Sequence, residues 1–238
     1  MTEKQLAKKF VHFIQELEKT YGPQGWWPRI CKTKNGYALF HRFGPHRRLA
    51  QPSLFEVSLG AILTQNTSWV NAETALACLA SNGLLSAERI LAAPLKTLER
   101  CVQASGYFHQ KAKKLKAFAK FFLSGEAIDR VSLLSVWGIG PETADTILLY
   151  GLGKKIFVID AYTRRLLVSL SGDETWLKRP YDEVRLFCES AFPGSVRGWQ
   201  EAHALIVRLG KDRTLLRKPS ASRTIERAHT VIPAKAGI

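Results

Sequence analysis

The stretch Leu133–Leu167 reads LLSVWGIGPETADTILLYGLGKKIFVIDAYTRRLL and determines how we interpret the rest of the chain. An apolar run is followed by the tetrapeptide GIGP at 138–141 and then by a second apolar segment. Glycine adopts backbone angles that other residues resist, and proline suits the first position of a helix. The stretch therefore predicts a helix, a tight glycine hairpin and a second helix that ends near 151–153.

The predicted hairpin has the properties of an anion site. Backbone N–H groups are exposed in such a turn, and the N-terminus of the following helix carries a partial positive charge. An acid, Asp160, follows the second helix after an apolar run at 156–159. Because Asp160 directly precedes another predicted helix, where aspartate is a favoured N-cap, a purely structural role stays open at this point.

The composition favours a polyanionic partner. Among 238 residues, 35 are Lys or Arg and 20 are Asp or Glu, which gives a formal net charge of +15. Such an excess is typical of proteins that bind nucleic acid, although a merely basic surface is the alternative. No apolar run approaches the ~20 residues that a membrane span needs, and the N-terminus is amphipathic rather than a signal peptide. We therefore expect a cytoplasmic protein that is associated with the nucleoid and has no membrane partner.

Helical periodicity extends along the chain, and the fold class that we predict is all-α. Besides the two helices of the hairpin, helices are expected at 3–21, 53–63, 68–80, 87–92, 94–102, 109–123, 162–170, 181–191 and 198–209. The tetrapeptide SLFE at 53–56 has the pattern of a capping box. The basic segment 29–52 is predicted to be irregular, and a short strand is considered only at 156–159.

Three motifs resemble the helix-hairpin-helix superfamily of DNA glycosylases, in its endonuclease III-like group. They are GIG at 138–140, TAD at 143–145 and VIDAYT at 158–163, with a weaker match from about 54 to 218. The resemblance implies two helical domains on either side of a DNA-binding cleft. One domain would span 51–153, the other would combine 1–50 with 154–219, and 220–238 would form a flexible tail.

The resemblance assigns catalysis to Asp160. Cleavage of an N-glycosidic bond builds positive charge on the sugar, and a fixed carboxylate near C1′ can stabilise this charge and orient the attacking water. Glu142 departs from the family pattern, because members that also cut the strand carry a lysine there whose amine forms a Schiff base with the sugar. Glutamate cannot form this bond. We therefore expect an enzyme without lyase activity.

No cofactor is expected. Many members of the superfamily hold an iron–sulfur cluster with four cysteines after their last helix, and the corresponding residues 210–219 contain no cysteine. The four cysteines of this chain are far apart in sequence: Cys31, Cys78, Cys101 and Cys188. No set of metal ligands accompanies His203 and Lys211, for which we expect structural roles.

The WWP tripeptide at 26–28 bears on the substrate. Its combination with LFEVSLGAILTQNT at 54–67 and the missing cluster cysteines resembles the 3-methyladenine glycosylase branch often called MagIII. Indole faces attract cations, and a purine methylated at N3 is cationic. The alternative is that both tryptophans are core residues. The base pocket that we predict comprises Trp26, Trp27, Pro28, Phe55 and Glu142.

DNA contacts are expected around the hairpin and around the polar break at 64–67. A glycosylase that acts on duplex DNA extrudes its target base and fills the gap, and the resemblance places Gln65 at this wedge position. An ordinary polar turn is the alternative. The resemblance also implies that the carbonyl groups of Trp137, Gly138 and Gly140 are candidates for binding a monovalent cation. The predicted DNA-binding residues are Gln65, Asn66, Thr67, Gly138, Ile139, Gly140, Thr143, Lys111 and Arg164, with Lys113 and Arg47 as weaker candidates.

These features together predict a monomeric, monofunctional DNA glycosylase of base-excision repair. Its partner would be damaged double-stranded DNA, and it would hydrolyse the bond to alkylated purines such as 3-methyladenine. A glycosylase for oxidised pyrimidines or mismatches is one alternative. A noncatalytic DNA-binding module that uses the same hairpin is the other.

Overall fold

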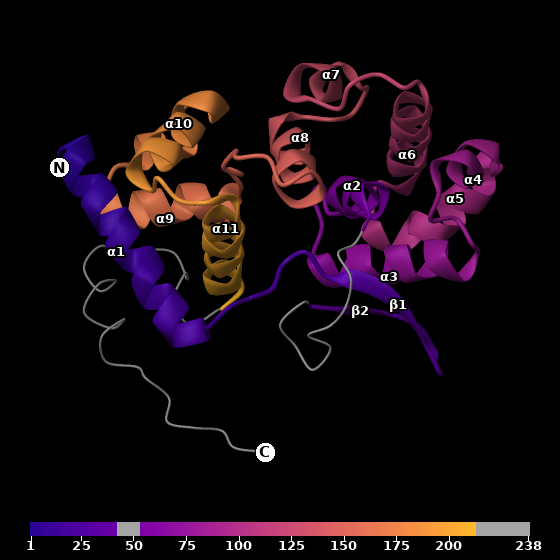
Figure 1. Ribbon diagram of the computed structural model, residues 1–238, viewed down its shortest axis with the longest axis horizontal. Coiled ribbons are helices and arrows are strands. Elements are labelled where there is room, and N and C mark those ends of the chain that lie inside the picture. The colour runs from indigo at the N-terminus through magenta and orange to yellow at the C-terminus, as the bar shows by residue number, and fades with distance from the viewer. Residues whose placement is uncertain (42–52, 213–238) are drawn as a thin grey trace. The chain divides into compact units, whose positions relative to one another are not determined.

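The computed structural model describes residues 1–41 and 53–212, and helices make up most of both ranges (Figure 1). The α-helices are α1 (Glu3–Tyr21), α2 (Leu54–Leu63), α3 (Trp69–Ser81), α4 (Ala87–Ala92), α5 (Leu95–Val102), α6 (Phe108–Leu123), α7 (Arg130–Ser135), α8 (Pro141–Thr146), α9 (Ala161–Ser171), α10 (Tyr181–Ala191) and α11 (Val196–Lys211). Shorter turns are the 3₁₀ turns η1 (Gln103–Ser105) and η3 (Glu174–Leu177) and the π-helical turn η2 (Ile147–Gly151). The predicted all-α class is confirmed. Within these two ranges, no helix combines the length and apolar content needed to cross a membrane.

A two-stranded antiparallel hairpin is the exception to the helical pattern. Strands β1 (Arg29–Thr33) and β2 (Gly36–Phe40) pair with Thr33 opposite Gly36, so that Lys34 and Asn35 form the turn. The prediction of irregular structure here is wrong. The pair Asn35-Gly36 at the turn is a hairpin signal, and this signal outweighs the basic character of the segment. The possible strand at 156–159 is wrong too, since β1 and β2 form the only ladder among the residues that the structure describes.

Contacts between residues divide the chain into two compact units. The hairpin unit comprises Pro23–Val158 and Gly194–Glu201, and the terminal unit comprises Met1–Gly22, Ile159–Pro193 and the residues from Ala202 onward. The prediction that 1–50 groups with the C-terminal residues is therefore wrong for the described part of 23–50. Its strands contact α3, and the Ile30 N–H donates to Glu56 Oε1 in α2 at 2.6 Å. The predicted tail at 220–238 lies outside the described residues, as does Arg47.

Helix α2 is the centre of the hairpin unit. Every residue from Phe55 to Leu63 is buried, and the helix contacts α3, α6, α8 and η2 (Figure 1). Ser53 caps its start by accepting the N–H of Glu56, as predicted, but the Glu56 carboxylate accepts the Ile30 N–H instead of completing the capping box. Burial raises the pKa of Glu56 above its usual value. A helix that is apolar on all sides is stable only when other elements enclose it.

The terminal unit has an apolar core of its own. Helix α1 contacts α9 and α10, and it buries one face that consists of Leu6, Phe10, Ile14 and Leu17. This spacing is that of an amphipathic helix against a core. Helix α9 also contacts η3, where Trp176 is buried. The N-terminal end of α9, which Asp160 precedes, is therefore supported by packed helices.

Gly60 provides a test of the packing around α2. A Cβ atom at Gly60 would lie 2.7 Å from Cζ2 of Trp27, whose indole ring is buried. Overpacking of this kind costs about 1–3 kcal/mol, which exceeds the ~1 kcal/mol of helix propensity that alanine gains over glycine. We expect Gly60→Ala to lower the free energy of unfolding in urea titrations.

Gly140→Ala is the matched control, because a Cβ atom there would meet nothing within 4 Å and the backbone φ is −96°. Its free energy of unfolding should stay close to that of the wild type. Equal stability of the two variants would show that Trp27 does not lie tightly against α2.

Candidate functional site

The hairpin between α7 and α8 has the predicted form. Gly138 has a φ of +87°, which favours glycine, and the Ile139 N–H closes the turn by donating to the Val136 carbonyl oxygen at 3.0 Å. Gly140 directly precedes α8, and Pro141 occupies the first helical position. Because Gly140 has no side chain that could cap the helix, the first N–H groups of α8 can donate to an anion.

A buried ion pair joins the two helices that flank the hairpin. Arg130 at the start of α7 donates from Nε to Oδ1 of Asp145 at 2.8 Å and from Nη2 to Oδ2 at 3.4 Å. The Asp145 side chain, in α8, is fully buried, whereas the Arg130 side chain is 25% exposed. A two-point contact of this kind fixes relative orientation as well as distance. The ion pair therefore holds α7 and α8 at the angle that the hairpin requires.

Gln65 belongs to the α2–α3 turn, and its side chain reaches the hairpin. Both ends of its amide group are hydrogen-bonded. Nε2 donates to the Gly138 carbonyl oxygen at 3.0 Å and to Thr143 Oγ1 at 2.9 Å, and Oε1 accepts from Lys114 Nζ. The buried Thr143 hydroxyl is thereby directed toward Gln65 rather than toward DNA, so its predicted DNA contact is not supported. One of the three carbonyl groups proposed for a cation, that of Gly138, already accepts a hydrogen bond. Gln65 could act as a wedge only after these bonds break.

Two cations that were predicted to contact DNA are instead structural. Lys111 is 2% exposed, and its Nζ donates to the carbonyl oxygens of Leu63 at 2.8 Å and Ser105 at 2.6 Å. Burial, together with the charge of Lys114, lowers the pKa of Lys111 to about 8. In the terminal unit, Arg164 Nη1 donates to the carbonyl oxygens of residues 176 and 179, both at 2.9 Å. Backbone acceptors draw both side chains inward, so the structure does not support the predicted DNA contacts of Lys111 and Arg164. Lys113 remains exposed.

Tyr107 is a surface feature that the sequence analysis missed. Its side chain is 71% exposed, and its φ of +47° is rare for an aromatic residue. Asn66, which is exposed, has a φ of +53°, and these two are the only non-glycine residues with positive φ in the part of the chain that the structure describes. Both line one cavity of about 250 Å³, together with Gln65, Gln110, Lys111 and Lys114. The only hint in the sequence was an aromatic residue directly after Gly106, at a helix start.

The three residues of the WWP tripeptide differ in their surroundings. Trp27 and Pro28 are buried, and the Trp27 ring centroid lies 5.1 Å from that of Trp69 and 5.4 Å from that of Tyr150. The core interpretation therefore holds for these two residues. Trp26 is partly exposed, and its ring centroid lies 4.7 Å from that of Trp69. Trp26 is the member of the tripeptide that remains accessible to a ligand.

The other predicted pocket residues are also divided. Phe55 is 5% exposed, and its ring packs against Phe118 and Phe122, with centroids 5.9 Å and 5.0 Å away. It belongs to the core around α2, and we leave it out of the base pocket. Glu142 is exposed in the first turn of α8, where a negative charge is favourable.

Asp160 is held by the helix that it precedes. Its Oδ1 accepts hydrogen bonds from the Thr163 N–H at 2.7 Å and from the Thr163 hydroxyl at 2.9 Å. Its Oδ2 lies 3.7 Å from Nε2 of His203, and the Asp160 side chain is 12% exposed. Burial lowers the pKa of His203, and the Asp160 carboxylate opposes this effect. The N-cap and a chemical role are therefore compatible, because the cap uses only one carboxylate oxygen.

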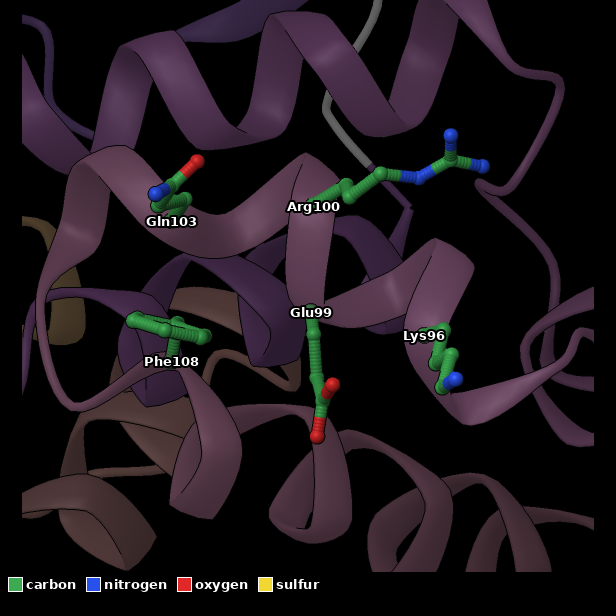
Figure 2. Close-up of a pocket in the computed structure, with 5 residues that line it drawn as sticks. All are labelled: Lys96, Glu99, Arg100, Gln103 and Phe108. Carbon is green, nitrogen blue, oxygen red and sulfur yellow. The ribbon is translucent and has the colours of Figure 1, made fainter.

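A cavity of about 520 Å³ lies along α5 and the start of α6, and Figure 2 shows the five residues that line it: Lys96, Glu99, Arg100, Gln103 and Phe108. None of the predicted site residues belongs to it. In residues 1–41 and 53–212, no group of three or more His, Cys, Asp or Glu side chains is placed to hold a metal ion.

The hairpin and the acid can now be compared with known proteins. Residues 59–193, more than half of the chain, match the HhH-GPD superfamily of base excision DNA repair proteins. The chain belongs to this superfamily. A provisionally named DNA repair glycosylase of Methanocaldococcus jannaschii is 36% identical over 200 residues, which cover 79% of this chain and 80% of the relative. The resemblance seen in the sequence is thus confirmed, and the protein is a DNA glycosylase of base excision repair.

Two solved glycosylase structures have a similar fold. The Helicobacter pylori 3-methyladenine DNA glycosylase MagIII, bound to 1,N6-ethenoadenine, is 26% identical with a TM-score of 0.66, over 89% of this chain and 98% of that chain. A non-covalent endonuclease III–DNA complex has a TM-score of 0.70 at 16% identity, over 92% of this chain and 91% of that chain. At this lower identity, the similarity to endonuclease III shows the fold alone.

Replacement of Arg130 tests whether its ion pair with Asp145 stabilises this glycosylase. We expect Arg130→Met to lower the free energy of unfolding by about 3 kcal/mol, since a buried carboxylate loses its cation. Urea titration measures the loss, and Arg100→Met, at an exposed arginine of the same unit, should change it little. Adding Asp145→Leu should restore much of the stability. If the double variant is less stable than Arg130→Met, the ion pair is not the source of the effect.

Proposed function

We propose that this glycosylase is monofunctional and that it releases alkylated purines such as 3-methyladenine. The observation that carries the proposal is the Asp160 carboxylate, which Thr163 holds by one oxygen while the side chain stays 12% exposed. Similarity to MagIII, whose solved complex contains 1,N6-ethenoadenine, supports an alkylated purine as the substrate. We assign Oδ2 of Asp160 to the substrate side of the reaction.

In the proposed reaction, the bond between C1′ and the base nitrogen breaks, and its electron pair leaves with the base. A purine alkylated at N3 is cationic, so it departs as a neutral base and needs no proton from a general acid. The Asp160 carboxylate stabilises the positive charge that develops on the sugar. It then accepts a proton from the attacking water, whose oxygen forms the new bond to C1′ and leaves an abasic sugar.

Glu142 supports the absence of a lyase step. A Schiff base requires an amine that attacks C1′, and a carboxylate at this position cannot supply one. Lys111, which lies in the same unit, is not a substitute, because its buried amine is hydrogen-bonded to two backbone carbonyl groups. The proposed product is therefore an intact strand with an abasic site.

Trp26 is the residue that we assign to the base. Its partly exposed ring is flanked by Trp69, with a centroid distance of 4.7 Å, and by His41, with a centroid distance of 5.0 Å. An indole face attracts a cation by about 0.5–2 kcal/mol, depending on how far the pair is desolvated. This attraction favours a cationic purine over a neutral normal base, and Trp27 packs beneath as support.

Duplex DNA is the proposed partner, and no cofactor is part of the mechanism. The hairpin N–H groups and the start of α8 bind a phosphate group, and the net charge of +15 attracts the strand. A carboxylate and a water molecule are sufficient for the chemistry above. The sequence at 210–219, without cysteine, supports an enzyme that works without an iron–sulfur cluster.

A glycosylase for oxidised pyrimidines or mismatches is a second candidate, which similarity to endonuclease III of Sulfolobus acidocaldarius favours. That relative is 26% identical over 183 residues, which cover 74% of this chain and 80% of the relative. A neutral pyrimidine leaves less readily than a cationic purine, and its departure requires stronger stabilisation of the leaving group. Release of bases from duplexes that carry 3-methyladenine or thymine glycol, measured side by side, separates the two candidates.

Replacement of Asp160 tests the catalytic assignment. In Asp160→Asn, the amide oxygen can still accept the Thr163 N–H, so the cap and the stability should be retained. The negative charge is lost, and we expect the single-turnover rate of 3-methyladenine release to fall by about 10²–10⁴-fold. Glu174→Gln removes an exposed acid of the same unit and is the matched control. Full activity of Asp160→Asn would rule out this mechanism.

Trapping with borohydride tests the absence of a lyase step. Borohydride reduces a Schiff base between enzyme and sugar to a stable covalent adduct, so a monofunctional enzyme yields none. We expect no adduct on gels after the protein excises a base from labelled duplex in its presence. A lysine-dependent glycosylase of the same superfamily serves as the positive control. An adduct formed by this protein would contradict the role that we give to Glu142.

A further inference from the structure

The Glu201 carboxylate, in α11, holds the chain segment that leads into Trp26. Its Oε2 accepts the Gln24 N–H at 2.7 Å, and its Oε1 accepts the Gly25 N–H at 3.2 Å. The two donors belong to consecutive residues, and Gly25 has a φ of +63°. Consecutive N–H groups that point to one side form a concave site for an anion. Each carboxylate oxygen therefore takes one donor, and Glu201 fixes the backbone directly before Trp26.

A second carboxyl group holds the same segment after the WWP tripeptide. Oε1 of Glu56, in α2, accepts the Ile30 N–H at 2.6 Å. The segment is thus tied to α11 at its start and to α2 at its end. Trp26 lies between these two anchors and is partly exposed, whereas the rest of the tripeptide is buried. Both anchors and the tripeptide belong to the hairpin unit, of which Glu201 is the last residue.

The aromatic neighbours of Trp26 contact its ring at an angle. The centroids of Trp69, His41 and Trp27 lie 4.7, 5.0 and 5.7 Å away, with interplanar angles of 60°, 44° and 73°. None of these three rings is parallel to the indole. Attraction between an indole and a cation requires the cation to lie over the ring face, within about 6 Å of the centroid. The attraction therefore depends on the direction in which the backbone presents the Trp26 ring.

We infer that Glu201 is a positioning residue for substrate selection: by fixing the backbone before Trp26, it orients the indole so that the enzyme prefers a cationic base. The inference rests on the proposed function, in which Trp26 faces the departing base. Glu201 acts through Trp26 and has no contact with the reacting atoms in this assignment. A carboxylate that only stabilised the fold would change stability and leave the preference between bases as it is.

The test measures how two free purines inhibit the release of 3-methyladenine from duplex DNA. One is the 3,9-dimethyladenine cation, and the other is neutral 1,N6-ethenoadenine. The ratio of their inhibition constants reports the preference for the cation. We expect Glu201→Ala to lower this preference by about 2- to 30-fold, the factor to which the attraction between an indole and a cation corresponds. Trp26→Ala should lower it equally, and the double variant should lower it no further.

Two further variants make the comparison specific. Glu126→Ala makes the same change at an exposed acid of the hairpin unit and should leave the preference for the cation unchanged. In Glu201→Gln, the amide oxygen can accept one of the two N–H groups, whereas the amide nitrogen is a donor and cannot accept the other. The preference of this variant should therefore lie between those of the wild type and Glu201→Ala.

The outcomes separate the inference from the proposed function. If folded Glu201→Ala keeps the preference of the wild type, or if it lowers the preference further in the Trp26→Ala background, the inference is wrong. Should Glu201→Ala not fold, as judged by circular dichroism, Glu201→Gln decides by the same criterion. If the wild type releases no 3-methyladenine, the proposed function fails. Quenching of tryptophan fluorescence by the two purines then measures the same ratio and still tests Glu201.

Discussion

The burial of α2 is the constraint on which the hairpin unit depends. Helix α2 is mostly apolar and is buried on all sides, so it is stable only because α3, α6, α8 and η2 enclose it. The carbonyl groups at its C-terminal end need donors from beyond the helix, and Thr64 and Gln65 supply several of them. The Lys111 ammonium group supplies a donor to the Leu63 carbonyl oxygen, and Lys111 lines the same cavity as Asn66 and Tyr107.

The glycine hairpin is also held in place by polar contacts with neighbouring elements. The Arg130–Asp145 ion pair fixes the helices on either side of the glycine hairpin, and Gln65 ties the hairpin to the end of α2. Buried polar groups of this kind are costly when incomplete, so they specify one arrangement rather than several. Rigid support of this sort holds the side chains of a binding surface in one geometry.

In the proposed mechanism, Asp160 serves both folding and chemistry. Its cap bonds to Thr163 stabilise the start of α9 and also hold the carboxylate in one orientation. Burial lowers the pKa of the neighbouring His203, and the Asp160 carboxylate opposes this effect. A preoriented carboxylate of this kind suits the positive sugar of the proposed transition state, and the proposed hydrolysis needs no amine at position 142.

Local patterns in the sequence determined the helices, the glycine hairpin, the superfamily and the position of Asp160, because each depends on residues that are neighbours in the chain. Even the missed β-hairpin had a local signal, in Asn35 and Gly36. Tertiary structure alone decided that Lys111 is buried, because its acceptors at Leu63 and Ser105 lie 48 and 6 residues away in the sequence. From the sequence, a lysine on an amphipathic helix is predicted to be exposed. It also decided that Phe55 belongs to the core and that the Gln65 amide is bound to the hairpin. These outcomes depend on which groups meet across the fold, and periodicity along the chain contains no information about such partners.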